Sequence, residues 1–131
     1  MAHSILLDTC VFLWLVRDDP SLSLKARELI ADPNNPVFLS VVSAWEITVK
    51  HGLGRLPLAD PPHIYVPNER KKHNIATLPL EEQAISQLGR LPSLHQDPFD
   101  RMLICQAIYH GCIFLTPDET ITRYPVNAQW S

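Results

Sequence analysis

The stretch SILLDTCVF, residues 4–12, places one carboxylate inside otherwise apolar sequence. Three aliphatic residues end on Asp8, and after Thr9 the sequence turns apolar again. A surface turn normally carries more polar residues, and a buried carboxylate needs a partner that offsets its lost hydration. The stretch therefore predicts a short buried strand over residues 5–7, a helix directly after it, and a partner against Asp8.

Length and composition indicate a globular protein. We expect the 131 residues to form one domain, residues 1–131, with a core of its own. A hydrophobic content of 46% and a charged content of 19% exclude a disordered chain. No apolar run has the length of a membrane span, and the N-terminus lacks the pattern of a signal peptide. Three cysteines without a C-x-x-C pair fit a reducing compartment, so we expect a cytoplasmic protein without a membrane partner.

The charge of the chain gives no general signature of nucleic-acid binding. The formal net charge is −3, and the basic run Arg70-Lys71-Lys72 is explained more simply as a solvated helix face than as a phosphate-binding patch. If the protein acts on nucleic acid, it must do so through a small site that a metal ion assists.

Short apolar runs alternate with segments of helical pattern along the chain. The predicted strands are residues 5–7, 37–39, 75–78 and 112–115, with a weak fifth one that includes Val126. The predicted helices are residues 10–17, 23–32, 45–50, 63–73, 81–88, 98–110 and 117–124. Pro67 either lies in the first turn of its helix or kinks it. Strands without polar alternation, separated by helices, predict an α/β fold with a parallel sheet covered on both faces.

Several carboxylates follow these strands or open these helices, and each has a simple structural explanation. Ser43-x-x-Glu46 and Thr116-x-x-Glu119 both fit a capping box. Asp97 before Pro98 fits an N-cap, and acids in a first turn suit the helix dipole. For any one of these acids alone, capping is the simpler interpretation.

Taken together, the acids indicate a metal site. All strands of a parallel sheet end at the same edge, where open α/β folds place their ligands. The acids expected to meet there are Asp8, Glu46, Asp100 and Asp118. Close carboxylates raise one another's pKa unless a cation neutralises them, and an all-oxygen set suits Mg²⁺ or Mn²⁺. A metal ion is then the partner of Asp8, provided that the sheet is parallel.

The same residues, in this order, resemble the PIN-domain ribonucleases, specifically the VapC-type toxins of bacterial toxin–antitoxin pairs. The similar segments are ILLDTCVFLW, SAWEITVKHGLGRLPL, LPSLHQDPFDRMLICQA and LTPDETITRYP, of which HQDPFDRMLICQA is the most specific. The resemblance implies a three-layer α/β/α sandwich with a central parallel sheet. It also implies a metal-dependent endoribonuclease that cleaves RNA, forms a homodimer and is inhibited by a cognate antitoxin.

Residue by residue, the resemblance assigns Asp8, Glu46, Asp100 and Asp118 as catalytic and metal-binding carboxylates for Mg²⁺ or Mn²⁺. Whether Asp118 or Glu119 completes the set stays open, as does the number of metal ions. Asp97 is less general across the family and either supports these ligands or caps its helix. Thr9 and Thr116 either orient carboxylates or a water molecule, or serve as caps.

The reaction implied by the resemblance is in-line attack of a metal-activated water on an RNA phosphodiester, leaving a 5′-phosphate and a 3′-hydroxyl. The antitoxin is expected to lie along the early apolar helices and to reach the acids with a basic side chain, preferably arginine. The helix over residues 10–17, apolar on nearly every side, lies either wholly inside the domain or offers Trp14 or Leu15 to a partner.

Two other functions compete with this interpretation. A phosphoacceptor signalling module also holds Mg²⁺ at a sheet edge, but usually has paired acids after its first strand and a lysine after a late one. Here Asp8 stands singly and LTPDET contains no lysine. A catalytically silent PIN scaffold stays open as the second alternative. Glycine-dependent nucleotide folds are excluded, because none of the four glycines follows the first strand.

Overall fold

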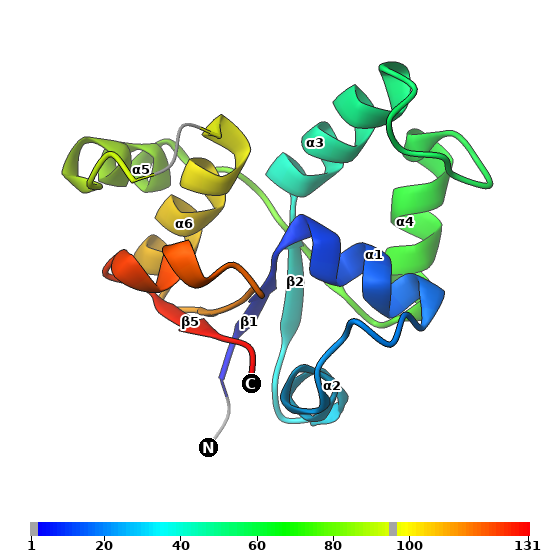
Figure 1. The fold of residues 1–131 in the computed structure, drawn as a ribbon, viewed down its shortest axis with the longest axis horizontal. Helices are drawn as coiled ribbons and strands as arrows, with labels where there is room; N and C mark the ends of the chain where they lie inside the picture. The colour runs from blue at the N-terminus through cyan, green and yellow to red at the C-terminus, as the bar shows by residue number, and fades with distance from the viewer. Residues whose placement is uncertain (1–2, 95–96) are drawn as a thin grey trace.

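A computed structural model describes residues 3–94 and 97–131, and five parallel strands form its central sheet (Figure 1). The strands are β1 (Ile5–Leu7), β2 (Val37–Ser40), β3 (Ala76–Leu78), β4 (Ile113–Leu115) and β5 (Asn127–Gln129). Their order across the sheet is β3-β2-β1-β4-β5, and every neighbouring pair is parallel. The predicted parallel sheet is confirmed.

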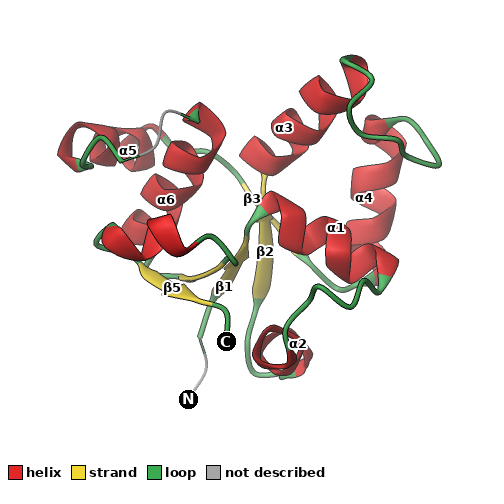
Figure 2. Cartoon of the chain, in the orientation of Figure 1, coloured by secondary structure: helices red, strands yellow, loops and turns green. Residues whose placement is uncertain are grey.

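Helices cover both faces of this sheet and complete a three-layer sandwich, as the resemblance implied. They are α1 (Thr9–Arg17), α2 (Leu24–Ala31), α3 (Val41–Gly52), α4 (Pro62–Lys72), α5 (Glu82–Ile85) and α6 (Pro98–His110), with two 3₁₀ turns, η1 (Ser86–Arg90) and η2 (Glu119–Arg123). Figure 2 shows α1, α2 and α4 on one side of the sheet and α5 and α6 on the other. None of the helices within the described ranges is both long and apolar enough to span a bilayer.

The three central strands are apolar because each of them contributes to two cores. In β1, Ile5 and Leu7 pack with α1, α2 and α4, whereas Leu6 packs with α6 on the opposite face. All three side chains are fully buried. A strand between two helical layers has no face for polar residues, and this explains the missing alternation in the sequence.

The two edge strands and the later helices differ in detail from the prediction. The fifth strand begins at Asn127, so Val126 precedes it. Pro67 lies inside α4, beyond the first turn. The helix predicted over residues 81–88 is one short α-helix followed by η1, and the hydroxyl of Ser86 donates to the carbonyl of Gln83 at their junction. Such local side-chain bonds favour tighter turns over a regular helix.

The strand order creates a switch point at the carboxyl ends of β1 and β4. The chain leaves β1 toward β2 on one side of it, and β4 returns on the other side. Leu7 pairs with Leu115, and the backbone N–H of Asp8 donates to the carbonyl oxygen of Leu115 over 3.0 Å. The residues that follow the two strands, Asp8 and Thr116, are therefore neighbours at the place where open α/β sheets bind ligands.

Candidate functional site

Asp8 is buried at this switch point, with only 8% of its surface exposed. It is the N-cap of α1, and its Oδ1 accepts a 2.7 Å hydrogen bond from the backbone N–H of Thr9. Its Oδ2 accepts a 2.7 Å bond from the hydroxyl of Thr116. Burial raises the pKa of Asp8, these two bonds lower it, and the charges of Glu46 and Asp118 raise it further.

Glu46 lies on α3, and its side chain is 5% exposed. The hydroxyl of Thr9 is 2.7 Å from its Oε1 and 2.8 Å from the hydroxyl of Ser43. A hydroxyl has one proton and a carboxylate only accepts, so Thr9 donates to Glu46 and receives a bond from Ser43. Lys50, one turn further along α3, forms an ion pair with Oε2 of Glu46. Both oxygens of this buried carboxylate are thus held.

The capping box Ser43-x-x-Glu46 does not form, so that explanation of Glu46 is wrong. The N-cap of α3 is Ser40, whose hydroxyl accepts from the backbone N–H of Val42 over 2.9 Å. The apolar run VFLS continues as strand to Ser40, and α3 therefore begins three residues earlier than a cap at Ser43 requires. Glu46 lies in the second turn of the helix, where it cannot cap its start.

The capping box Thr116-x-x-Glu119 is also absent. The N-cap of η2 is Asp118, whose carboxylate accepts a 2.9 Å bond from the backbone N–H of Thr120. The hydroxyl oxygen of Thr116 instead accepts from the backbone N–H of Asp118 over 3.2 Å while its proton goes to Asp8. Thr116 therefore connects two of the acids across the switch point.

Asp97 does cap α6, as predicted. Its Oδ1 accepts from the backbone N–H groups of Phe99 and Asp100, over 2.8 and 3.3 Å. Asp100 lies in the first turn of the same helix and is half-buried. The sequence HQDPFDR places both acids at this helix start, but its His95 and Gln96 lie outside the described residues.

The thiol of Cys10 lies close to three of the acids. The pKa of its thiol is raised to about 12, first by burial and then by the charges of Asp8, Asp100 and Glu46. The charge of Asp118 in turn raises the pKa of Asp8. The structure therefore brings all four sequence-predicted carboxylates into one region, from the ends of two strands and from α3 and α6.

The chemistry of this donor set fits a hard divalent cation. All the candidate ligands are carboxylate oxygens, and the charged form of Asp8 is disfavoured by burial and by neighbouring acids, so a cation would stabilise it. Within residues 3–94 and 97–131, however, no three histidine, cysteine or acidic side chains already form a group of metal ligands. The acids are gathered in one region without being arranged as a coordination shell.

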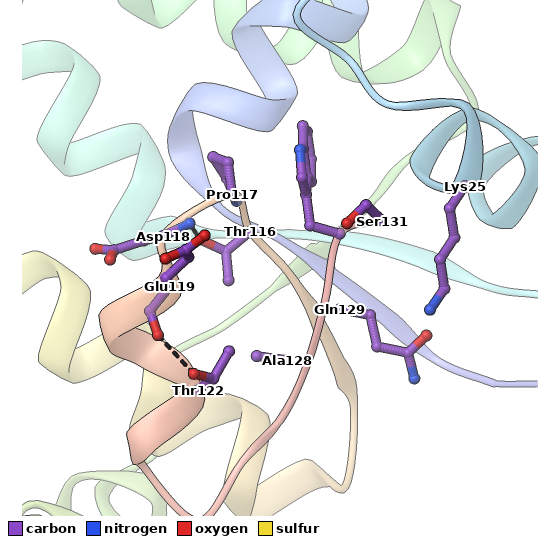
Figure 3. A pocket seen from close by; sticks show the side chains of 10 residues that line it. Lys25, Thr116, Pro117, Asp118, Glu119, Thr122, Ala128, Gln129 and Ser131 are labelled. Carbon is purple, nitrogen blue, oxygen red and sulfur yellow. Dashed lines mark hydrogen bonds between the residues drawn. The ribbon is translucent and has the colours of Figure 1, made fainter.

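An open hollow of about 260 Å³ adjoins the acids on the side of η2 (Figure 3). Its lining includes Thr116 and Asp118, which belong to the acidic region, and Gln129 and Trp130 near the C-terminus. Lys25 lines it from α2. Solvent and ligands can reach Asp118 through this hollow, and its wall is partly polar and partly aromatic.

Lys50 and Ser43 are the site residues that the sequence reasoning missed. A glutamate followed four residues later by a lysine is a known helical ion-pair spacing, so the pattern Glu46-x-x-x-Lys50 could have identified the lysine. Ser43 carried no comparable signal, because its role depends on a contact with Thr9, 34 residues away in sequence.

Comparisons with known proteins place this geometry among characterised folds. A family model described as PIN domain matches residues 5–127. Ribonuclease VapC16 of Mycobacterium tuberculosis is 33% identical over 57 residues, and this match spans 44% of the chain and 40% of that relative.

Solved structures agree with the fold. The toxin–antitoxin complex VapBC2 from Rickettsia felis, bound to a promoter DNA fragment, matches with a TM-score of 0.74 at 15% identity, over 98% of this chain and 99% of that one. FitAcB from Neisseria gonorrhoeae matches with a TM-score of 0.60 at 20% identity, over 95% of both chains. At these identities the likeness shows the fold alone.

Proposed function

The chain belongs to the PIN domain family, and from this premise we propose that it is a metal-dependent endoribonuclease, the toxin of a toxin–antitoxin pair. The observation that carries the proposal is the burial of Asp8 beside Glu46 and Asp118 at the switch point of a parallel sheet. Burying several carboxylates together destabilises a protein. A bound cation offsets this cost, and such costly sites are commonly functional.

In this proposal the ligands of Mg²⁺ or Mn²⁺ are Asp8, Glu46, Asp100 and Asp118. A bound divalent ion would lower the pKa of a water molecule and offset charge on the phosphate. Thr116 holds Oδ2 of Asp8, and Thr9 holds Oε1 of Glu46. Asp97 fixes the start of α6 and thereby the position of Asp100.

RNA is the substrate that this site suits. The relative VapC16 is called a ribonuclease, and a hollow of about 260 Å³ exposes Asp118 to solvent. The three cysteines are all free, which fits work in the reducing cytoplasm. A catalytically silent scaffold would share the fold, but it would have no need to retain buried acids that destabilise it.

We assign the antitoxin to the exposed side of α1. Trp14 and Leu15 are only partly buried there, and the ring of Trp14 packs against that of Trp130 at 5.7 Å between centroids. A peptide lying over these side chains could extend an arginine into the acids, where a planar guanidinium pairs with carboxylates. Charged substitution of Leu15 should weaken the complex formed on co-expression with the neighbouring gene's product, and undiminished co-purification would contradict this assignment.

A second copy of the chain fits a different surface, an apolar stripe on α3. Val41, Trp45 and Val49 recur at four-residue spacing on α3, Leu53 follows as its C-cap, and all four are exposed, Trp45 by 55%. Side chains at this spacing share one helix face. Substituting Trp45 by glutamate should convert a homodimer into a monomer in sedimentation, and an unchanged sedimentation coefficient would place the dimer contact elsewhere.

Cleavage of RNA by the purified protein tests the function directly. Total RNA incubated with the protein and Mn²⁺ or Mg²⁺ should yield discrete fragments with 5′-phosphate ends, and EDTA should abolish them. Protein carrying Asp8→Asn, prepared in parallel, controls for contaminating nucleases. Equal fragmentation by the two proteins, or intact RNA at every metal concentration, would reject the proposal.

A further inference from the structure

Lys50 is a cation at the solvent side of the acidic region. It lies in the last turn of α3, one turn after Glu46, and its ammonium is ion-paired with Oε2 of that residue. The side chain of Lys50 is 46% exposed, whereas that of Glu46 is 5% exposed. The ammonium is thus paired with a buried acid, while the half-exposed side chain leaves room for an incoming ligand.

The charges around Lys50 come from two helices. Its hydrogen bond with Glu46 is the main cause that raises its pKa, and the charges of Asp97 and Asp100 add to it. Glu46 belongs to α3, whereas Asp97 and Asp100 belong to the start of α6. The ammonium is therefore near acids of both α3 and the start of α6.

Support of the buried Glu46 is one role of this lysine, but it uses only part of the ammonium. Oε1 of Glu46 is already held by Thr9. An ammonium carries three N–H donors, and the contact with Glu46 needs one of them. The others are available to an anionic oxygen.

We propose that Lys50 is a catalytic residue whose ammonium donates to a non-bridging oxygen of the scissile RNA phosphate; this rests on the proposed function. The net charge is −3 and the region where the acids meet is negative, so a positive side chain beside the proposed metal ion favours the approach of a phosphate. Lysine binds phosphate as a point charge. As the water oxygen bonds to phosphorus and the bond to O3′ breaks, a proton from that water ends on O3′, and Lys50 keeps its own proton throughout.

Three variants separate this role from a structural one. Lys50→Met keeps the aliphatic stem and removes the charge, whereas Lys50→Arg keeps the charge. Lys72→Met is the matched control, because Lys72 also pairs with a glutamate of its own helix, Glu69, over 3.3 Å. α4 ends at Lys72, shortly before β3 begins, so this lysine lies at the edge of the sheet opposite the acids.

Kinetics on a short RNA with one cleavage site give the first measurement. Lys50→Met should lower kcat about 100-fold, as loss of one donor to a developing oxyanion does. Its Mn²⁺ affinity, measured by calorimetry without RNA, should fall about tenfold or less, and the loss of kcat should persist at saturating Mn²⁺. Lys50→Arg should recover much of the rate, and Lys72→Met should match wild type. A wild-type kcat for Lys50→Met at saturating Mn²⁺ would show that the lysine only positions Glu46.

RNA binding without cleavage gives a second, independent measurement. In protein that also carries Asp8→Asn, Lys50→Met should reduce the slope of log affinity against log salt by about 0.7, the value for one phosphate contact on a single strand. An unchanged slope would overturn the contact. If wild-type protein cleaves no RNA at all, the proposed function fails, and this slope still decides whether Lys50 meets a phosphate.

Discussion

Two helices of this protein begin directly after an aspartate, and the two aspartates differ in nearly every physical respect. Asp97 before α6 is half-buried and accepts two backbone N–H bonds from its own helix. Asp8 before α1 is almost fully buried, accepts one such bond, and accepts its second bond from Thr116, which follows β4. Both aspartates cap a helix, but only Asp8 also bears the cost of a buried charge.

The difference lies in where each helix starts relative to the sheet. α1 follows the central strand β1 and begins inside the molecule, next to β4, whereas residues 92–94, shortly before α6, are exposed. A cap near solvent keeps part of its hydration, but a cap in the interior loses it and its pKa rises. Helix capping explains Asp97, whereas the burial of Asp8 is explained by the cation that we propose.

The largest expected effect is the loss of cleavage in Asp8→Asn, on the order of 1,000-fold or more, because a ligand of the catalytic ion is removed. Asparagine caps helices as well as aspartate does, so α1 should be retained. Cleavage assays and circular dichroism on the same preparation measure both. Full activity would remove Asp8 from the site, and gross unfolding would show that its role is structural.

The pH dependence of stability should differ in the same variant. Burial raises the pKa of folded Asp8 above its ordinary 3.8, so folding favours the protonated form. Its favourable contribution is present at low pH and is lost as the pH rises through the raised pKa. Without metal, Asp8→Asn should therefore raise the melting temperature at neutral pH and have little effect at acidic pH. A lower melting temperature at neutral pH would contradict this reasoning.

A smaller contrast is expected between Glu46→Gln and Ser43→Ala. Glutamine cannot carry the charge that an ion requires, and cleavage should fall about 100-fold or more. Ser43→Ala leaves Glu46 its bonds from Thr9 and Lys50, and should cost about tenfold or less, as outer partners of metal ligands do. Rates of both variants at saturating Mn²⁺ test this order. Equal and modest losses would demote Glu46 from a ligand to a structural residue.

The smallest effect on cleavage is expected for Asp97. Asp97→Ala removes the cap of α6 and should cost about 1 kcal/mol of unfolding free energy, whereas Asp97→Asn keeps the cap and should cost little. Urea titrations compare the two. Cleavage should fall far less in either variant than in Asp8→Asn. If Asp97→Asn abolishes cleavage while its stability is unchanged, Asp97 is itself a ligand and the contrast between the two helix starts disappears.

The elements of the central sheet could be predicted because burial on both faces leaves a mark in local sequence. Residues 5–7 are apolar at every position, and such runs between helical segments indicate a parallel sheet. The edge strand β5 has no fully buried residue, so its signal in the sequence was weak and Val126 was assigned wrongly to it. The sequence also did not distinguish the 3₁₀ turns η1 and η2 from α-helices. Local hydroxyl–carbonyl bonds at Ser86 and Thr122 favour the tighter turns.

The sequence by itself determined the candidate acids and their order, since carboxylates after apolar strands stand out against the run of aliphatic residues. The tertiary structure decided how each acid is held. Ser40 rather than Ser43 caps α3, Thr9 reaches Glu46 across 37 residues, and Thr116 reaches Asp8 across 108. Hydrogen bonds of this range depend on how separate strands and helices pack against one another, which no local pattern encodes. Whether a capping acid stays near solvent or is buried beside other acids is therefore a property of the folded chain.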